Sequence, residues 1–95
     1  MLFRSEIDGL IARNGEWLGL VDDQAVVSGA DFEVVADEVV DRVLAGGREL
    51  LTLLTGDEDV DIEPLMARIS ARHPGVEIEV HHGGQPHYPL LVLAE

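Results

Sequence analysis

The chain has 95 residues, which is enough for one domain with a single modest core. Its 19 acidic residues face only six arginines and no lysine, so the formal net charge is −13. Such a surface repels phosphate backbones and anionic lipid headgroups, which argues against nucleic-acid binding and peripheral membrane attachment. It would attract a cationic partner surface or a metal ion, although a solvated acidic surface that keeps the chain in solution is the preferred interpretation.

The first 28 residues predict small strands joined by tight turns, because glycines at positions 9, 15 and 19 separate short apolar pieces. Residues 18–21 and 24–27 are typical of a hairpin closed by Asp22 and Asp23. Trp17 is expected to cover one end of the core, because a lone tryptophan more often packs than forms a ligand platform.

A helix is predicted over residues 31–45, with Asp31 as its N-cap. Apolar side chains recur at the helical period before two glycines end the run: Phe32, Val35, Ala36, Val39, Val40 and Val43. The following segment, residues 49–55, is almost continuously apolar, which predicts a central strand covered on both faces.

A second amphipathic helix is predicted around Leu65 and Ile69, with Pro64 in its first turn. Residues 76–81 alternate between apolar and polar, which predicts a strand with one buried face. Residues 88–94 predict a last strand, and Pro89 near its start suggests an edge position.

This order predicts an α/β fold. We expect a small mixed sheet with a β-α-β-α-β core, two helices, an N-terminal hairpin region and a C-terminal edge strand. Both helices should be right-handed crossovers between parallel strands. Residues 1–6 lack the pattern of a signal peptide and no apolar run approaches the ~18 residues of a spanning helix, so we expect a cytoplasmic chain.

If the strands at 24–28, 49–54 and 76–81 are parallel, their carboxyl ends lie along one edge of the sheet. Open α/β sheets bind ligands at such edges, where backbone amides converge. Three glycine-bearing turns would then meet in one candidate binding surface: Ser28 and Gly29, Thr55 and Gly56, and Gly83, Gly84 and Gln85.

The acidic loop at 57–63 weakens a phosphate-binding interpretation, because carboxylates would crowd a bound anion and the chain has no phosphate-loop lysine. It could instead suggest calcium, through Asp57, Asp59, Asp61 and a later glutamate. However, Ile62 stands where an EF-hand loop needs glycine and Arg68 where it needs glutamate. Capping of the following helix is therefore the preferred explanation.

His81, His82 and His87 cluster around the last glycine turn and could suggest zinc. Strand alternation sends His81 and His82 to opposite faces, so exposed or hydrogen-bonded imidazoles are the preferred interpretation. His73 is expected at a helix end as a dipole partner. With no cysteine and no nucleophile elbow, we expect no catalytic residues and no metal site.

Four blocks of the sequence resemble one known family. The tail from Gly83 to Leu91 places paired glycines before two prolines that bracket an aromatic residue. Asp8 and Gly9, residues 15–20 and residues 49–56 follow the same order and spacing. Together these blocks resemble the C-terminal end of the A-type subunits of bacterial fatty acid kinase, a family whose members carry a DhaL-type, dihydroxyacetone-kinase-like domain.

The resemblance implies that residues 1–95 are one domain, the final lobe of a larger kinase-subunit protein. In that family the ATP-binding kinase domain comes first, and the C-terminal region is thought to engage a separate fatty-acid-binding subunit. ATP and Mg²⁺ would then belong to the absent kinase domain, so no cofactor is expected here. The implied function is to dock a DegV-like partner, so that the kinase domain can phosphorylate the bound fatty acid.

On this interpretation the tail turn is the candidate partner-binding segment, although its glycines and prolines also suit a structural corner. The residues concerned are Gly83, Gly84, Gln85, Pro86, His87 and Tyr88. The alternative hypothesis is an independent small-ligand or metal-binding module. Such a module could be a homodimer in which the strand at 88–94 pairs across a two-fold axis.

Overall fold

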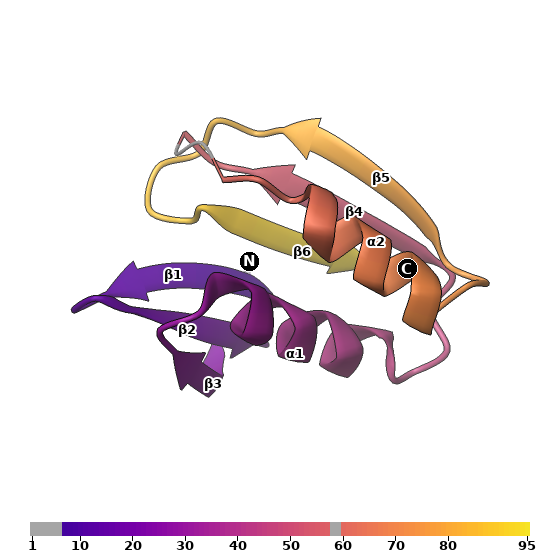
Figure 1. Ribbon diagram of the computed structural model, residues 1–95, viewed down its shortest axis with the longest axis horizontal. Helices are drawn as coiled ribbons and strands as arrows, with labels where there is room; N and C mark the ends of the chain where they lie inside the picture. Colours follow the sequence, from indigo (N-terminus) through magenta and orange to yellow (C-terminus); the bar gives the residue numbers. More distant parts are fainter. Residues whose placement is uncertain (1–6, 58–59) are drawn as a thin grey trace, which may run out of the picture.

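The computed structural model describes residues 7–57 and 60–95, arranged as six strands and two helices (Figure 1). In chain order the elements are β1 (Gly9–Arg13), β2 (Glu16–Val21), β3 (Gln24–Gly29), α1 (Phe32–Leu44), β4 (Leu50–Thr55), α2 (Glu63–Arg72), β5 (Glu77–His82) and β6 (Leu90–Ala94). The predicted α/β class and both predicted helices are therefore confirmed. Residues 1–6, used above for the localisation, and Asp59, considered as a calcium ligand, lie outside the described residues.

The strands form one mixed sheet in the order β3-β2-β1-β6-β4-β5. Only β4 and β5 are parallel neighbours, and every other adjacent pair is antiparallel. The helix α2 thus connects two adjacent parallel strands, as predicted. The helix α1 does not, because β2, β1 and β6 lie between the strands that it joins.

Two tight turns build the N-terminal hairpins. Asn14 and Gly15 both have positive φ (52° and 78°), and so do Asp22 and Asp23 (53° and 67°). Two consecutive positive φ angles are the requirement of a type I′ turn, whose twist matches that of the flanking strands. The local chemistry of these residues therefore sets the register of β1, β2 and β3.

Both helices begin and end where local chemistry predicts. The Asp31 side chain accepts a hydrogen bond from the Glu33 amide at 3.0 Å, which caps the first turn of α1. The N-cap of α2 is Ile62, which makes no side-chain capping bond, but Asp61 just before it accepts a hydrogen bond from the Glu63 amide at 3.1 Å, so the acidic loop satisfies one amide of the first turn. His73 forms the C-cap of α2.

A single core lies between the helices and one face of the sheet. Register places Leu10, Leu53 and Leu90 on the same face, because directly opposed residues of paired strands point to the same side. These side chains are fully buried together with Val39 of α1 and Ile69 of α2. Both helices therefore cover the same side of the sheet, as Figure 1 shows.

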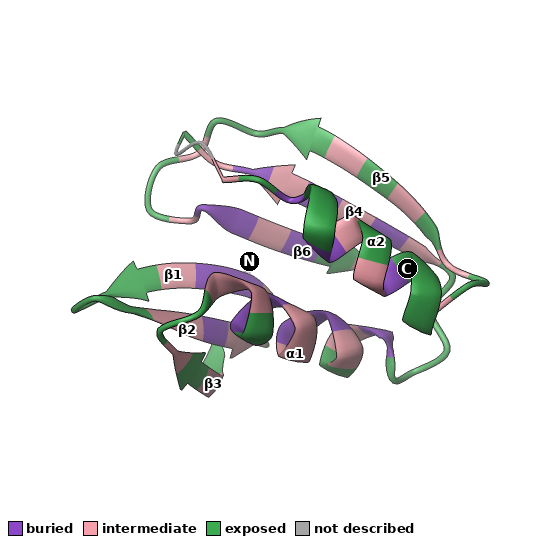
Figure 2. Cartoon of the chain, in the orientation of Figure 1, coloured by how far each residue is buried: buried purple, intermediate pink, exposed green. Residues whose placement is uncertain are grey.

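The predicted coverage of β4 on both faces is wrong. Along this strand burial alternates, with Leu51, Leu53 and Thr55 buried and their neighbours only half-buried (Figure 2). The reason is that both helices take the same face, which leaves no described element over the other. Because leucines occupy both faces of β4, its sequence resembles that of a strand covered on both sides.

The predicted edge position of the last strand is also wrong. The strand β6 pairs with β1 on one side and with β4 on the other, so its backbone is internal to the sheet. Pro89 instead precedes the strand, where its missing N–H costs no ladder hydrogen bond. Dimerisation by edge pairing of residues 88–94 is thereby ruled out for this fold.

Trp17 packs partly buried against the core and meets Phe32 edge to face, with ring centroids 4.9 Å apart. This geometry confirms its predicted packing role. No helix within the described residues is long and apolar enough to cross a membrane.

Gly19 provides a test of the helix–sheet contact. A Cβ atom there would lie 2.5 Å from Val39 Cγ2 and 2.6 Å from Val27 Cγ1. We expect Gly19→Ala to lower the free energy of unfolding by about 1–3 kcal/mol through overpacking, measured by urea denaturation. Gly75→Ala is the control, because nothing lies within 4 Å of a Cβ there; equal stability of the two variants would contradict this packing.

Candidate functional site

The tail turn, residues 83–89, crosses the end of β4 on its way from β5 to β6. The Gly83 and Gly84 amides both donate to the Thr55 carbonyl, at 2.8 and 3.0 Å. In return the Gly56 amide donates to the Pro89 carbonyl at 3.0 Å. The structure thus brings together two of the three predicted turns, the one after β4 and the one after β5.

The Gln85 side chain stabilises the tail turn by hydrogen bonds to backbone carbonyls. Its Nε2 donates to the carbonyl of Leu54 at 3.2 Å and to that of Tyr88 at 2.9 Å. The Asp57 amide donates to the Gln85 carbonyl at 3.2 Å. These contacts use the turn's polar groups for its own construction, so Gly83, Gly84 and Gln85 form a structural corner.

Gly56 allows the two turns to approach each other. A Cβ atom at this position would lie 2.5 Å from the Tyr88 carbonyl oxygen and 2.8 Å from that of Gln85. Backbone atoms cannot move aside as a flexible side chain can. The corner is therefore compatible only with glycine at position 56.

A surface hollow of about 590 Å³ lies beside this corner. Its lining is mainly apolar, with one carboxylate and one imidazole: Ile11, Ala12, Asp57, Pro86, His87, Tyr88 and Pro89. The outer part of the tail turn thus lines a concave surface, while its glycines hold the inner corner. A hollow of this kind suits an apolar or cationic side chain of a partner.

Ser28 and Gly29 do not join this site. They end β3, at the opposite side of the sheet from β5, and three strands separate β3 from β4. At about 4.8 Å per strand the separation is roughly 19 Å. The prediction that all three turns meet is wrong, because β3 and β4 are not neighbours.

The tail histidines lie apart in the structure. His82 contacts the buried Thr55 through Nδ1 and Oγ1 at 2.8 Å, whereas His81 contacts Glu79 through Nε2 and Oε1 at 3.2 Å. They point to opposite faces, as strand alternation predicts. Within residues 7–57 and 60–95, no group of three or more His, Asp or Glu side chains is placed to hold a metal ion.

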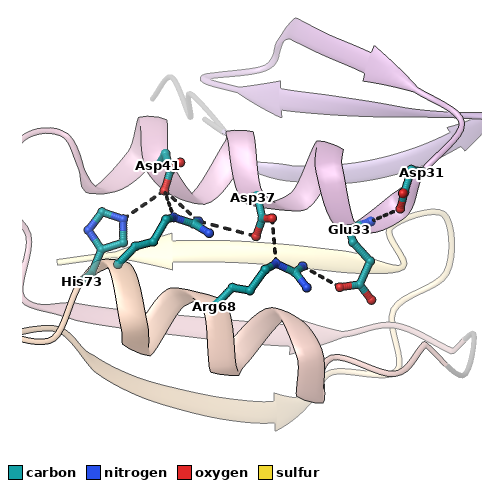
Figure 3. Close-up of polar contacts among 7 residues, drawn as sticks. Asp31, Glu33, Asp37, Asp41, Arg68 and His73 are labelled. Atoms are coloured by element: carbon teal, nitrogen blue, oxygen red, sulfur yellow. Dashed lines mark hydrogen bonds and ion pairs between the residues drawn. The ribbon is translucent and has the colours of Figure 1, made fainter.

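The densest polar cluster lies instead between the two helices (Figure 3). Arg68 of α2 pairs with Glu33 at 2.5 Å and with Asp37 at 2.8 Å on α1. Arg72 pairs with Asp41 at 2.9 Å, and His73 contacts the same carboxylate at 3.0 Å. Since both arginines are neutralised by acids of the neighbouring helix, the cluster fastens α1 to α2 and presents no unpaired group to a ligand.

The surroundings of Asp41 shift its ionisation. Partial burial by itself raises the pKa of Asp41, but hydrogen bonds and positive charge from His73 and Arg72 outweigh that effect and lower it. The ionised carboxylate is thus the form that the folded state favours. This is the behaviour expected of an interhelical fastening, because a catalytic acid would need the opposite shift.

Comparison with known proteins identifies the family, and the match covers almost the whole chain. A family profile for the C-terminal domain of FakA-like proteins, in which FakA is the A-type subunit of fatty acid kinase, matches residues 3–95. The chain belongs to this family. This FakA-like domain has no pair of acidic side chains around its hollow that could serve as general acid and base among the residues described, since Asp57 is the hollow's one carboxylate.

Longer relatives also match. An uncharacterized protein of Staphylococcus aureus strain MRSA252 is 34% identical over 93 residues, which covers 96% of this domain and 17% of that protein. Counterparts from strains USA300 and NCTC 8325 have the same identity and coverage. The domain therefore spans about a sixth of the length of the curated relatives that it matches.

Four residues of the hollow were not among the predicted binding residues, namely Ile11, Ala12, Asp57 and Pro89. The sequence contains little indication of Ile11. It follows the buried Leu10, so alternation predicts only that its side chain lies on the other face of a strand. Its place beside the tail turn depends on the pairing of β1 with β6, which no local pattern discloses.

Gly84 tests the geometry of the corner. Its φ is +66°, where an L-residue is strained, although nothing lies within 4 Å of a Cβ there. We expect Gly84→Val to lower the free energy of unfolding by about 1–2 kcal/mol or more, because a β-branched side chain disfavours this conformation. Gly84→Asn should lose less, since asparagine tolerates it; unchanged stability of the valine variant would contradict the positive φ.

Asp41 makes a pH-dependent prediction. Because its pKa is lowered on folding, the stabilisation is complete above the ordinary value of 3.8 and is lost as pH falls through the lower, folded value. Asp41→Asn should remove that part of the acid dependence in pH-dependent chemical denaturation. With Asp41 about half exposed, the effect should stay below about 1 kcal/mol.

The exposed Glu49, whose side chain forms no hydrogen bond or ion pair within the described residues, is the control for this measurement. Glu49→Gln should leave the acid dependence close to that of the unaltered chain. If the two variants showed the same loss, the interhelical origin of the effect would be refuted.

Proposed function

We propose that this chain is the accessory lobe through which a fatty acid kinase docks a DegV-like fatty-acid-binding protein. In this proposal a separate kinase domain phosphorylates the bound acyl group, and the lobe supplies recognition. The observation that carries the proposal is the match of residues 3–95 to the C-terminal domain of FakA-like proteins. ATP and Mg²⁺ would bind to that separate domain.

The geometry is consistent with recognition by surface complementarity. The hollow beside the tail turn has apolar walls formed by Ile11, Pro86 and Tyr88, with Asp57 at its margin. Apolar pockets of this type commonly receive an anchoring side chain of a protein partner, surrounded by a polar rim. Together with the net charge of −13, this arrangement favours a partner that presents a cationic margin.

Charge also disfavours other large ligands. Phosphate backbones and anionic bilayers would approach an acidic surface that carries three times as many carboxylates as arginines. A protein partner with basic residues gains a steering attraction from the same field. The proposal therefore commits to a protein partner, and the cytoplasm is the compartment in which such a kinase would meet it.

The test is a calorimetric titration of the folded chain with a DegV-like fatty-acid-binding protein, at low and at moderate salt. We expect saturable binding whose dissociation constant rises with salt, because the Debye length shortens to about 8 Å at physiological ionic strength. Absence of binding by a chain shown to be folded would exclude docking by this lobe. Binding without salt dependence would exclude the electrostatic contribution but leave docking itself in place.

A further inference from the structure

The side of the sheet turned away from both helices is apolar. Register places eight side chains in its central part, which we call the open face: Ile11, Leu18, Leu20, Leu50, Thr52, Leu54, Leu91 and Leu93. Charged and polar residues on the same side lie around them, at Arg13, Glu16, Glu77, Glu79 and His81. Seven of the eight are half-buried, and Leu93 is 51% exposed. In Figures 1 and 2 both helices lie on the other side of the sheet.

This composition is unusual for a solvated sheet face. An antiparallel sheet that faces water on one side alternates apolar residues inward with polar residues outward. The edge strand β5 follows that rule, since Glu77, Glu79 and His81 share the open side. The antiparallel pair β4 and β6 does not, because Leu54 lies opposite Leu91 and Leu93 lies opposite Thr52.

Two hollows extend the open face. Ile11 belongs both to the face and to the hollow of about 590 Å³ beside the tail turn. At the other side, Leu18 and Ser28 line a second hollow of about 310 Å³. Residues of the open face thus reach from the hollow beside the tail turn across the sheet to β3, where Ser28 belongs to the candidate turn that lies far from the other two.

One margin of the open face is acidic. Glu77 and Glu79 are exposed along β5, and no ion pair within the described part of the chain joins either of them to an arginine. On the helix side, by contrast, Arg42, Arg68 and Arg72 are all paired with carboxylates of α1. Each of the four carboxylates of α1 thus has an arginine partner, whereas Glu77 and Glu79 beside the apolar surface have none among the described residues.

We propose that the open face is the docking surface for the fatty-acid-binding partner, whose matching surface has an apolar centre and arginine or lysine at its margin. This inference rests on the proposed function and adds the surface and the chemistry of recognition. An apolar centre with a charged margin is the usual anatomy of an interface. The sheet side of the molecule, with extents of 37 and 34 Å, is wide enough for the roughly 800 Å² that each partner contributes to a standard interface.

Charge selects this occupant over two others. A second copy of the chain would bring the acidic margins of two molecules, each of net charge −13, toward each other. An anionic bilayer would be repelled in the same way. A protein surface with an apolar centre and a cationic margin would complement both parts of the open face.

Two exposed apolar side chains provide a matched pair of variants. Leu93 is 51% exposed on the open face, and Val34 is 61% exposed on α1, on the opposite side of the molecule. Titration with a DegV-like fatty-acid-binding protein should show that Leu93→Asp raises the dissociation constant at least about tenfold. Val34→Asp, which adds the same charge, should change it less than about twofold, and unfolding curves of both variants should confirm that they fold.

A second variant tests the acidic margin along β5. Reversing the charge of Glu77 and Glu79 to arginine should weaken binding at low salt and flatten the salt dependence, because the steering attraction is removed. Sedimentation of the unaltered chain should show a monomer. A dimer that Leu93→Asp dissociates would assign the open face to a second copy and overturn the proposal.

The remaining outcomes separate this inference from the function on which it rests. If the unaltered chain binds and both aspartate variants bind equally well, docking stands and the open face is not its surface. If the folded, unaltered chain does not bind, the proposed function fails and this inference fails with it.

Discussion

The packing of both helices against one side of the sheet is the constraint on which the rest of the structure depends. The core contains side chains from α1, α2 and the inner faces of β1, β4 and β6, and it forms one continuous cluster. The ion pairs of Arg68 and Arg72 with acids of α1 hold the helices side by side over that core. As a result the domain has two layers, and its second sheet face carries no described element.

The tail turn follows from the topology of the same sheet. The chain leaves β5 at an edge and must cross the end of β4 before it inserts β6 between β4 and β1. Hydrogen bonds to the backbone of Thr55 and Gly56 secure this crossing, and close approach explains why glycine is required at position 56. The most distinctive stretch of the sequence is therefore explained first by folding, and its outer residues can contribute to recognition.

Local patterns predicted the helices and most of the strands. The N-cap at Asp31, the helical period of its valines and the alternation of β5 are encoded within a few residues, and the structure agrees with them. The position of β6 could not be predicted, because its pairing with β1 joins residues about 80 apart in sequence. Insertion of this strand also separates Ser28 from the tail turn, which is why only two of the three predicted turns meet.

The apolar run of β4 illustrates a second limit. Burial on both faces and burial on one face beside an apolar docking surface produce the same sequence pattern. The pattern indicated that Leu50 and Leu54 should be covered, whereas the fold leaves them on the open face. On the proposed function, the missing cover is an intermolecular contact, so the failed prediction and the docking hypothesis have one physical cause.

Leucine-methyl NMR of the chain with a DegV-like fatty-acid-binding protein tests this conclusion most directly, because strand alternation places leucines on both faces of the same strands. Addition of the partner should shift the methyl resonances of Leu54, Leu91 and Leu93 most strongly. The buried Leu51, Leu53 and Leu65 should shift far less. Perturbations confined to residues of the helices, with the open-face leucines unchanged in a saturated complex, would contradict docking through the sheet.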